Sequence, residues 1–268
     1  MKNKYILIFI IVLLILISAK TTNSKTIINH YKSISYYNPN NLKRYISYQN
    51  KNKNLSRKEI VKKVNMNLDK DWYTDTLPAL NINTYIVLVN KYYYLKEDYI
   101  PNQLELLDNN YSIRNLYLVK TAKTSFENLA KDAKKIGLTI KAMSTYRSYS
   151  YQDNLYKKYV TLDGIEKADT YSARPGYSEH QTGLAIDVFN EKSSYTDFEN
   201  TEEYKWMQEH AHEYGFILRF PKEKEEETGY QFEAWHYRYV GITPATYIKK
   251  NNITLEEYIA KKKPLWRD

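Results

Sequence analysis

The histidines are the residues of this chain best suited to chemistry, because its 268 residues include no cysteine. Without cysteine there is no disulfide and no thiolate metal site, so a bound metal would depend on histidine and carboxylate side chains. The five histidines are His30, His180, His210, His212 and His236. Side chains two residues apart in a helix point about 200° from each other. His210 and His212 therefore do not form a chelating pair, and His30, in a polar stretch, is expected to be solvated.

Two of the histidines stand in segments that also hold carboxylates. His180 lies in a glycine-bearing turn, and Asp187 follows it in an apolar run. His236 follows closely after Glu233. Two histidines and one carboxylate, with a fourth position for water, are a ligand set typical of catalytic zinc, and a nearby glutamate that is not a ligand can act as the base. Each segment alone is equally typical of a histidine packed in a core, so the residues by themselves leave both interpretations open.

Three motifs, in order along the chain, resemble those of one known family. The segment Ser178–Asp187 is similar to the Ser-x-His-x-x-Gly-x-Ala-x-Asp signature of the VanY-like D-alanyl-D-alanine carboxypeptidases. These carboxypeptidases belong to a wider group that also contains lysostaphin-type peptidases and hedgehog N-terminal domains. The segment Glu233–Gly241 resembles the Glu-Pro-Trp-His-x-Arg-Tyr-Val-Gly element, with Ala234 in place of proline. Ser144–Ser148, with Gln152, resembles the Tyr-Arg-Ser-x-x-x-Gln element. The likeness runs from about residue 84 to residue 262.

The resemblance implies a zinc enzyme, with one metal ion per domain, that hydrolyses the terminal D-Ala-D-Ala bond of peptidoglycan stem peptides and releases D-alanine. A planar guanidinium suits the task of binding the substrate's free carboxylate in a bidentate manner. The residues that would carry the implied roles are the zinc ligands His180, Asp187 and His236, the general base Glu233, the carboxylate clamp Arg147, and the further substrate contacts Gln152 and Ser178.

Other functions share parts of this pattern. An L,D-carboxypeptidase or a cross-bridge endopeptidase would use the same metal chemistry with a pocket of different shape. A non-catalytic zinc-binding or wall-binding module, as found among hedgehog-like relatives, would be favoured by loss of the general base. Glu233 is present, which favours an enzyme.

The apolar runs predict an α+β fold with a small, mainly antiparallel sheet flanked by helices. The expected strands cover residues 85–89, 138–142, 184–189, 216–220 and 230–240. The strand at 138–142 ends shortly before Arg147, and the strand at 184–189 carries Asp187. The sheet is therefore expected to deliver the residues of the site.

Side chains able to cap a helix mark where helices are expected to begin. Residues 56–59 and 124–127 each form a Ser/Thr-x-x-Glu capping box ahead of apolar residues at helical spacing. Ser148 is expected to cap a helix directly after Arg147, and a helix N-terminus adds positive potential there. A further helix is expected over residues 202–214.

The first residues have the composition of an export signal. Lys2 and Lys4 precede an uninterrupted apolar run over residues 5–17, a pattern typical of a secretory signal peptide. The run is shorter than the roughly 20 residues of a spanning helix, but Ile17 stands where cleavage prefers a small residue, so an uncleaved anchor remains open. We expect a signal peptide or membrane anchor over residues 1–20, a stem with a short helix over 21–83, and the catalytic domain over 84–268.

The net charge of +9 is compatible with several partners. Lysines are dispersed among glutamates and no nucleic-acid-binding motif is present, so we expect no nucleic acid. Anionic wall polymers or lipid headgroups suit a basic exported protein equally well. The expected partners are peptidoglycan stem peptides, with the membrane contacted only through the N-terminal segment. A monomer is expected, either secreted or held at the outer face of the cytoplasmic membrane.

Overall fold

The computed structural model describes residues 28–262. The predicted signal peptide or anchor lies outside the described residues. The described residues divide into two compact units, one of residues 28–69 with 260–262 and the other of residues 70–259. Within the described residues no helix is both long enough and apolar enough to cross a membrane.

The described part of the first unit is a small helical structure. The 3-10 helix η1 (Pro39–Asn41) leads into α2 (Leu42–Lys51), and α3 (Arg57–Asn65) follows. The capping box predicted at residues 56–59 is confirmed, because the Ser56 and Glu59 side chains each bond the other residue's backbone N–H. Helix α2 lies where the sequence shows no sustained periodicity. Its buried side chain is Tyr45, which stacks on Tyr31, so α2 contributes an aromatic side chain, without aliphatic periodicity, to a core that also holds Ile60 and Val61.

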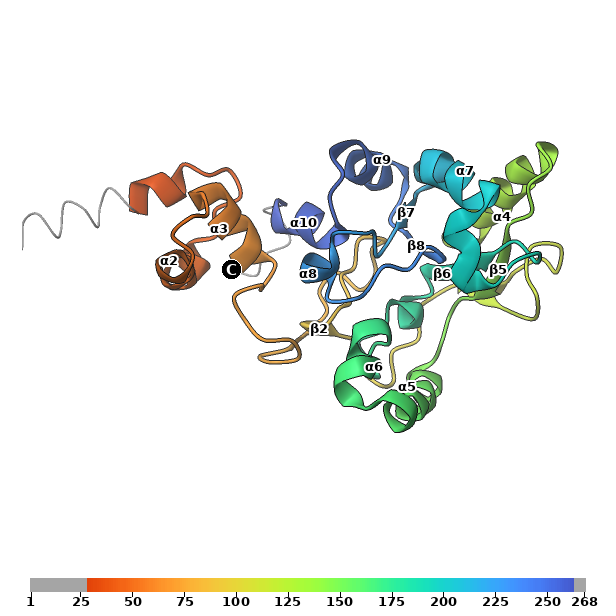
Figure 1. The fold of residues 1–268 in the computed structure, drawn as a ribbon, viewed down its shortest axis with the longest axis horizontal. Helices are drawn as coiled ribbons and strands as arrows, with labels where there is room; N and C mark the ends of the chain where they lie inside the picture. Colours follow the sequence, from red (N-terminus) through yellow and green to blue (C-terminus); the bar gives the residue numbers. More distant parts are fainter. Residues whose placement is uncertain (1–27, 263–268) are drawn as a thin grey trace, which may run out of the picture. The chain divides into compact units, whose positions relative to one another are not determined.

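The second unit contains a four-stranded antiparallel sheet in the order β5-β6-β8-β7 (Figure 1). Its strands are β5 (Lys141–Ser144), β6 (Ala185–Phe189), β8 (His236–Tyr239) and β7 (Phe216–Leu218). Two short pairs accompany it, the parallel pair β1 (Leu77–Pro78) with β2 (Tyr93–Tyr94) and the antiparallel pair β3 (Leu104–Leu106) with β4 (Tyr117–Val119). The predicted α+β fold with a small, mainly antiparallel sheet is confirmed.

Helices flank this sheet, and Figure 1 shows α5 and α6 as an adjacent pair. The α-helices are α4 (Lys120–Lys135), α5 (Tyr149–Asp163), α6 (Ile165–Tyr171), α7 (Glu202–His210), α8 (Glu225–Thr228), α9 (Ile242–Asn251) and α10 (Leu255–Ala260). The short 3-10 helices are η2 (Glu179–Thr182), η3 (Tyr195–Asn200) and η4 (Ala211–Tyr214). The main core joins the apolar face of α4, including Phe126 and Leu129, to Ile186 and Val188 of β6. This packing anchors the central strand that carries Asp187.

Two of the local predictions are wrong. Helix α4 begins at Lys120, so Thr124 does not cap it; its hydroxyl instead donates to the Lys120 carbonyl inside the helix. Residues 85–89 form no strand, although Val87 and Val89 are buried. The Tyr85 and Val87 carbonyls accept hydrogen bonds from the Arg238 side chain, so a buried guanidinium takes the place of a neighbouring strand.

Several other predicted boundaries are shifted or too wide. Strand β5 starts at Lys141 rather than at residue 138, and β8 covers only His236–Tyr239 of the strand predicted at 230–240. Strand β7 ends at Leu218, and the helix predicted over 202–214 becomes a 3-10 helix after His210. The helix cap predicted at Ser148 is confirmed, because its hydroxyl accepts from the Tyr151 N–H.

Candidate metal centre

Strand pairing brings the carboxylate and one histidine of the site together. Asp187 of β6 lies directly opposite His236 of β8, and Ser144 of β5 pairs with Asp187 from the other side. Side chains opposite each other in antiparallel strands are close neighbours. Thus His236 Nδ1 lies 3.1 Å from Asp187 Oδ1.

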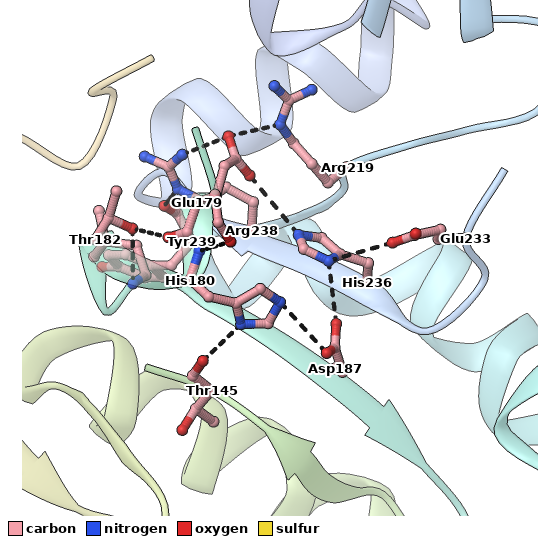
Figure 2. A network of polar contacts seen from close by, with 12 residues as sticks. Thr145, Glu179, His180, Thr182, Asp187, Arg219, Glu233, His236, Arg238 and Tyr239 are labelled. Atoms are coloured by element: carbon pink, nitrogen blue, oxygen red, sulfur yellow. Dashed lines mark hydrogen bonds and ion pairs between the residues drawn. The ribbon is translucent and has the colours of Figure 1, made fainter. Parts of the chain in front are cut away.

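His180 reaches the same point from the turn before β6. The Ser178 side chain caps η2 by accepting from the His180 N–H, and Gly183 ends the turn in the left-handed conformation, at a φ of 67°. His180 Nε2 lies 3.4 Å from Asp187 Oδ2 (Figure 2). The two imidazole rings meet edge to face, with centroids 5.0 Å apart.

The three side chains have the composition and spacing of a metal site. One ligand atom from each of His180, Asp187 and His236 lies within 4.8 Å of the others, and all three residues are buried. Asp187 Oδ1 is a buried oxygen that makes no hydrogen bond within the described structure. Buried polar atoms normally have a partner, so this oxygen fits a metal ligand. Two histidines and an aspartate suit zinc.

The tautomer of His180 follows from its other nitrogen. Its Nδ1 lies 2.6 Å from the Thr145 carbonyl oxygen (Figure 2). A carbonyl only accepts, so Nδ1 carries the hydrogen and Nε2 presents its lone pair toward Asp187. Burial, with Arg147 nearby, lowers the pKa of His180 to about 4, so the imidazole is neutral, as a ligand requires.

Glu233 stands beside this group without belonging to it. Its Oε2 lies 3.4 Å from His236 Nδ1, and its backbone N–H donates to the Phe220 carbonyl. Burial raises the pKa of Glu233 to about 7, and the nearby Asp187 carboxylate adds to this rise. A carboxylate with a pKa near neutrality is suited to accept and return a proton.

The Arg147 side chain directly contacts one of the candidate metal ligands, which its motif alone does not predict. Its Nη2 donates to Asp187 Oδ2 at 2.6 Å and its Nε to Ser144 Oγ at 2.9 Å. The side chain keeps 20% of its surface exposed. The backbone N–H also donates to the His180 carbonyl, at 3.3 Å. Arg147 is therefore held at the metal group as a partly exposed cation.

The two further substrate contacts that the resemblance implies, Gln152 and Ser178, have structural partners. Gln152 of α5 is buried, and its Nε2 donates to the Ala173 carbonyl, while its Oε1 is buried without a hydrogen bond in the described structure. Ser178 is buried and its hydroxyl caps η2. Both residues, together with Arg147 and Glu233, line a cavity of about 430 Å³. Their placement is compatible with substrate contact, which remains a prediction.

The remaining histidines of the predicted helix take no part. His210 Nδ1 contacts Glu213, and the ring lies against Trp206. Neither His210 nor His212 joins a group of possible metal ligands in residues 28–262.

Sequence reasoning missed Glu179, which is buried between the metal group and two arginines. Its Oε2 lies 3.8 Å from His236 Nε2. The only signal in the sequence was its position next to His180. Its arginine partners lie far along the chain, Arg219 just after β7 and Arg238 in β8, so spacing could not reveal the contact.

The sequence and the fold of this chain are similar to those of known peptidases. The family model described as VanY, D-alanyl-D-alanine carboxypeptidase, matches residues 115–242. The protein YodJ of Bacillus subtilis (strain 168) is 37% identical over 223 residues, which cover 78% of this chain and 82% of YodJ. The structure of the LD-carboxypeptidase LdcB is 39% identical, with a TM-score of 0.66, over 71% of this chain and 92% of that one. A mutant of the D,D-pentapeptidase VanY in complex with Zn(II) is 32% identical, with a TM-score of 0.57, over 65% of this chain and 98% of that one. The chain therefore belongs to the VanY family of D-alanyl-D-alanine carboxypeptidases.

Proposed function

We propose that this chain is a zinc-dependent carboxypeptidase that removes the terminal D-alanine from peptidoglycan stem peptides ending in D-Ala-D-Ala. The observation that carries the proposal is the convergence of His180, Asp187 and His236 beside the buried Glu233, in a cavity that also holds Arg147. A zinc site with a separate base is the equipment that peptide hydrolysis needs.

Each residue has a distinct task in this proposal. His180, Asp187 and His236 would hold a zinc ion, which would supply Lewis-acid chemistry at the scissile peptide carbonyl. Glu233 accepts a proton at its carboxylate and returns it to the amine of the departing D-alanine. Arg147 binds the free carboxylate of the terminal residue through charge-assisted hydrogen bonds. A carboxylate there would compete with Asp187 for the guanidinium, which the structure pairs at 2.6 Å.

A second candidate is an L,D-carboxypeptidase, which removes the last residue of a tetrapeptide stem. The observation that favours it is the higher identity to LdcB, 39% against 32% for the D,D-pentapeptidase VanY. Both activities need the same metal and base. They differ in the configuration of the residue that precedes the scissile bond.

The test is to incubate the zinc-loaded protein separately with a pentapeptide stem ending in D-Ala-D-Ala and with the corresponding tetrapeptide. Mass spectrometry then follows the loss of D-alanine. Cleavage of the pentapeptide alone supports the proposal, and cleavage of the tetrapeptide alone supports the second candidate. Cleavage of neither peptide, with cleavage of cross-linked dimers, would assign an endopeptidase. No cleavage of any of them would assign a binding module.

We further propose that the protein works as a monomer outside the cytoplasmic membrane, either secreted or attached through residues 1–20. The basic, then apolar, N-terminal pattern supports export. Cell fractionation, with N-terminal sequencing of the exported form, would distinguish a cleaved signal from an anchor. Recovery of the protein only from the cytoplasm would contradict this proposal.

A further inference from the structure

Four charged residues form a fully buried cluster behind the metal group. Glu179, Arg219, Arg238 and Glu256 each expose 4% of their surface or less. Two carboxylates and two guanidinium groups balance each other, as buried charges must. Figure 2 shows Glu179 between the two arginines and His236. The cluster touches the site at one metal ligand, so its arrangement bears on the metal.

One oxygen of Glu179 is held from two sides. Its Oε1 accepts from Arg219 Nε and from Arg238 Nη1, each at 2.8 Å. Arg219 in turn binds Glu256 with two hydrogen bonds, of 2.9 and 2.6 Å. Arg238 also donates to the Val87 carbonyl, at 2.8 Å. With both arginines fixed elsewhere, the Glu179 carboxylate has a set position and orientation.

The other oxygen of Glu179 faces a nitrogen that also has no hydrogen bond. Within the described structure, Glu179 Oε2 and His236 Nε2 are both buried atoms without a hydrogen-bond partner, and they lie 3.8 Å apart. Buried donors and acceptors are normally satisfied. A carboxylate oxygen only accepts. If His236 Nδ1 binds the metal, the single hydrogen of the neutral ring is on Nε2, where it faces the complementary Glu179 oxygen.

We propose that Glu179 is a positioning residue that fixes His236 as the metal ligand through Nδ1. The Glu179 carboxylate favours the hydrogen on Nε2, which leaves the Nδ1 lone pair available to a metal ion on the side of the ring where Asp187 and Glu233 lie, 3.1 and 3.4 Å from Nδ1. His180 is arranged in the opposite sense, because the Thr145 carbonyl occupies its Nδ1 and frees its Nε2. Acceptors behind metal-bound histidines commonly set tautomer and ring orientation. This inference rests on the zinc site of the proposed function, but not on the substrate.

The cluster also connects Glu179, through Arg219, to the helix at the C-terminal end of the second unit. Glu256 lies in α10, after the last motif residue of the site, and it holds Arg219 against Glu179. Asn90 Nδ2 donates to Glu256 Oε1, at 3.2 Å, which fixes that carboxylate in turn. The zinc affinity of the site therefore depends on a helix that contributes no ligand.

The first test is Glu179→Gln, which keeps the size of the side chain but replaces one carboxylate oxygen with an NH2 group. Because Arg219 and Arg238 donate to the remaining oxygen, the NH2 group faces His236 and cannot accept its hydrogen. The matched control is Glu203→Gln, because Glu203 is equally buried but accepts from the neutral Thr139 N–H and Asn190 side chain. Zinc affinity is measured by competition with a chromophoric chelator, without substrate. We expect Glu179→Gln to weaken zinc binding roughly tenfold to a hundredfold, and Glu203→Gln to leave it unchanged. Equal affinities in the wild type and Glu179→Gln, or equal losses in both variants, would overturn the proposal.

Loss of one buried carboxylate leaves the cluster with an excess positive charge, which can prevent folding. The double variant Glu179→Gln/Arg238→Gln restores the charge balance, while Arg219 Nε still takes the amide oxygen at position 179 and leaves the NH2 group toward His236. We expect it to bind zinc as weakly as the single variant. Recovery of wild-type zinc affinity would show that charge imbalance, rather than positioning, caused the loss.

A spectroscopic measurement on the wild type needs no variant to fold. In the zinc-loaded protein, proton NMR edited by nitrogen-15 should detect the hydrogen on His236 Nε2. Its signal should be shifted downfield and should exchange slowly with water, because the buried Glu179 carboxylate accepts a hydrogen bond from it. A rapidly exchanging proton, or metal coordination through Nε2, would refute the positioning role. Because no peptide is present, this result is independent of whether the substrate assignment is correct.

Discussion

Arg147 offers the sharpest test of whether the enzyme requires a free C-terminal carboxylate on its substrate. If its guanidinium binds a free C-terminal carboxylate, the enzyme should cleave a peptide acid much faster than the same peptide with an amidated C-terminus. In the structure Arg147 uses Nε on Ser144 and Nη2 on Asp187, and its side chain keeps 20% of its surface exposed in the cavity. It is thus both anchored and open to a ligand.

The size of the effect follows from the kind of contact. A hydrogen bond to a charged group contributes about 1.5–3 kcal/mol, and about 1.4 kcal/mol corresponds to a tenfold change in rate. Amidation should therefore lower kcat/KM by roughly tenfold to a hundredfold. Arg147→Ala should remove most of the difference between acid and amide, and Arg147→Lys, which keeps the charge but loses the planar fork, should keep part of it.

The assay compares kcat/KM for acid and amide in all three proteins, with zinc content measured in each. Arg147 contacts Asp187, so a variant that has lost zinc says nothing about the clamp and is compared only after zinc saturation. Equal hydrolysis of acid and amide by the wild type would refute the carboxylate clamp. It would point instead to an endopeptidase, for which a neutral internal bond is the natural substrate.

Three further predictions concern the metal, the base and a turn. His236→Ala should lose most of its zinc after dialysis, which elemental analysis would detect; wild-type zinc content would contradict the ligand assignment. Glu233→Gln should keep zinc and lose about a hundredfold to ten-thousandfold in kcat. Burial raises the pKa of Glu233 to about 7, so the base is protonated at low pH and wild-type kcat should fall as the pH drops. The positive charge of bound zinc favours the carboxylate form, which moves this fall in kcat below pH 7. Gly183→Ala should destabilise the protein by roughly 1–3 kcal/mol because of its φ of 67°. Its added Cβ would also lie 2.9 Å from Leu104 Cδ2, whereas the Cβ of Gly137→Ala, at a φ of 84°, would meet no atom within 4 Å. Gly183→Ala should therefore lower Tm more than Gly137→Ala, and an equal drop in Tm would show that crowding at Gly183 is unimportant.

Much of the site could be predicted from short stretches of sequence, because local rules govern them. The Ser148 cap needs only a hydroxyl ahead of a helix, and the structure confirms it. The candidate ligands His180 and Asp187 lie on one turn and the strand that follows, so a single local motif specifies both. His236 was identified from its own motif, and the structure brings it to the same point.

Local rules failed where longer-range packing competed with them. Thr124 and Glu127 match a capping box, yet α4 extends back to Lys120 and buries Ala122 in the core. Residues 85–89 have the composition of a strand, but their carbonyls bind the side chain of Arg238. In both cases the preferred structure depends on residues that the local pattern does not contain.

Strand register and buried charge were decided only by the tertiary structure. Asp187 meets His236 because β6 pairs with β8 in one register, and a shift of one residue would turn the side chains to opposite faces of the sheet. Glu179 has a partner for its charge only because Arg219 and Arg238 fold against it from distant segments. A sequence motif names the residues of such a site, but the contacts that hold them depend on hydrogen bonds and ion pairs between segments far apart in the chain.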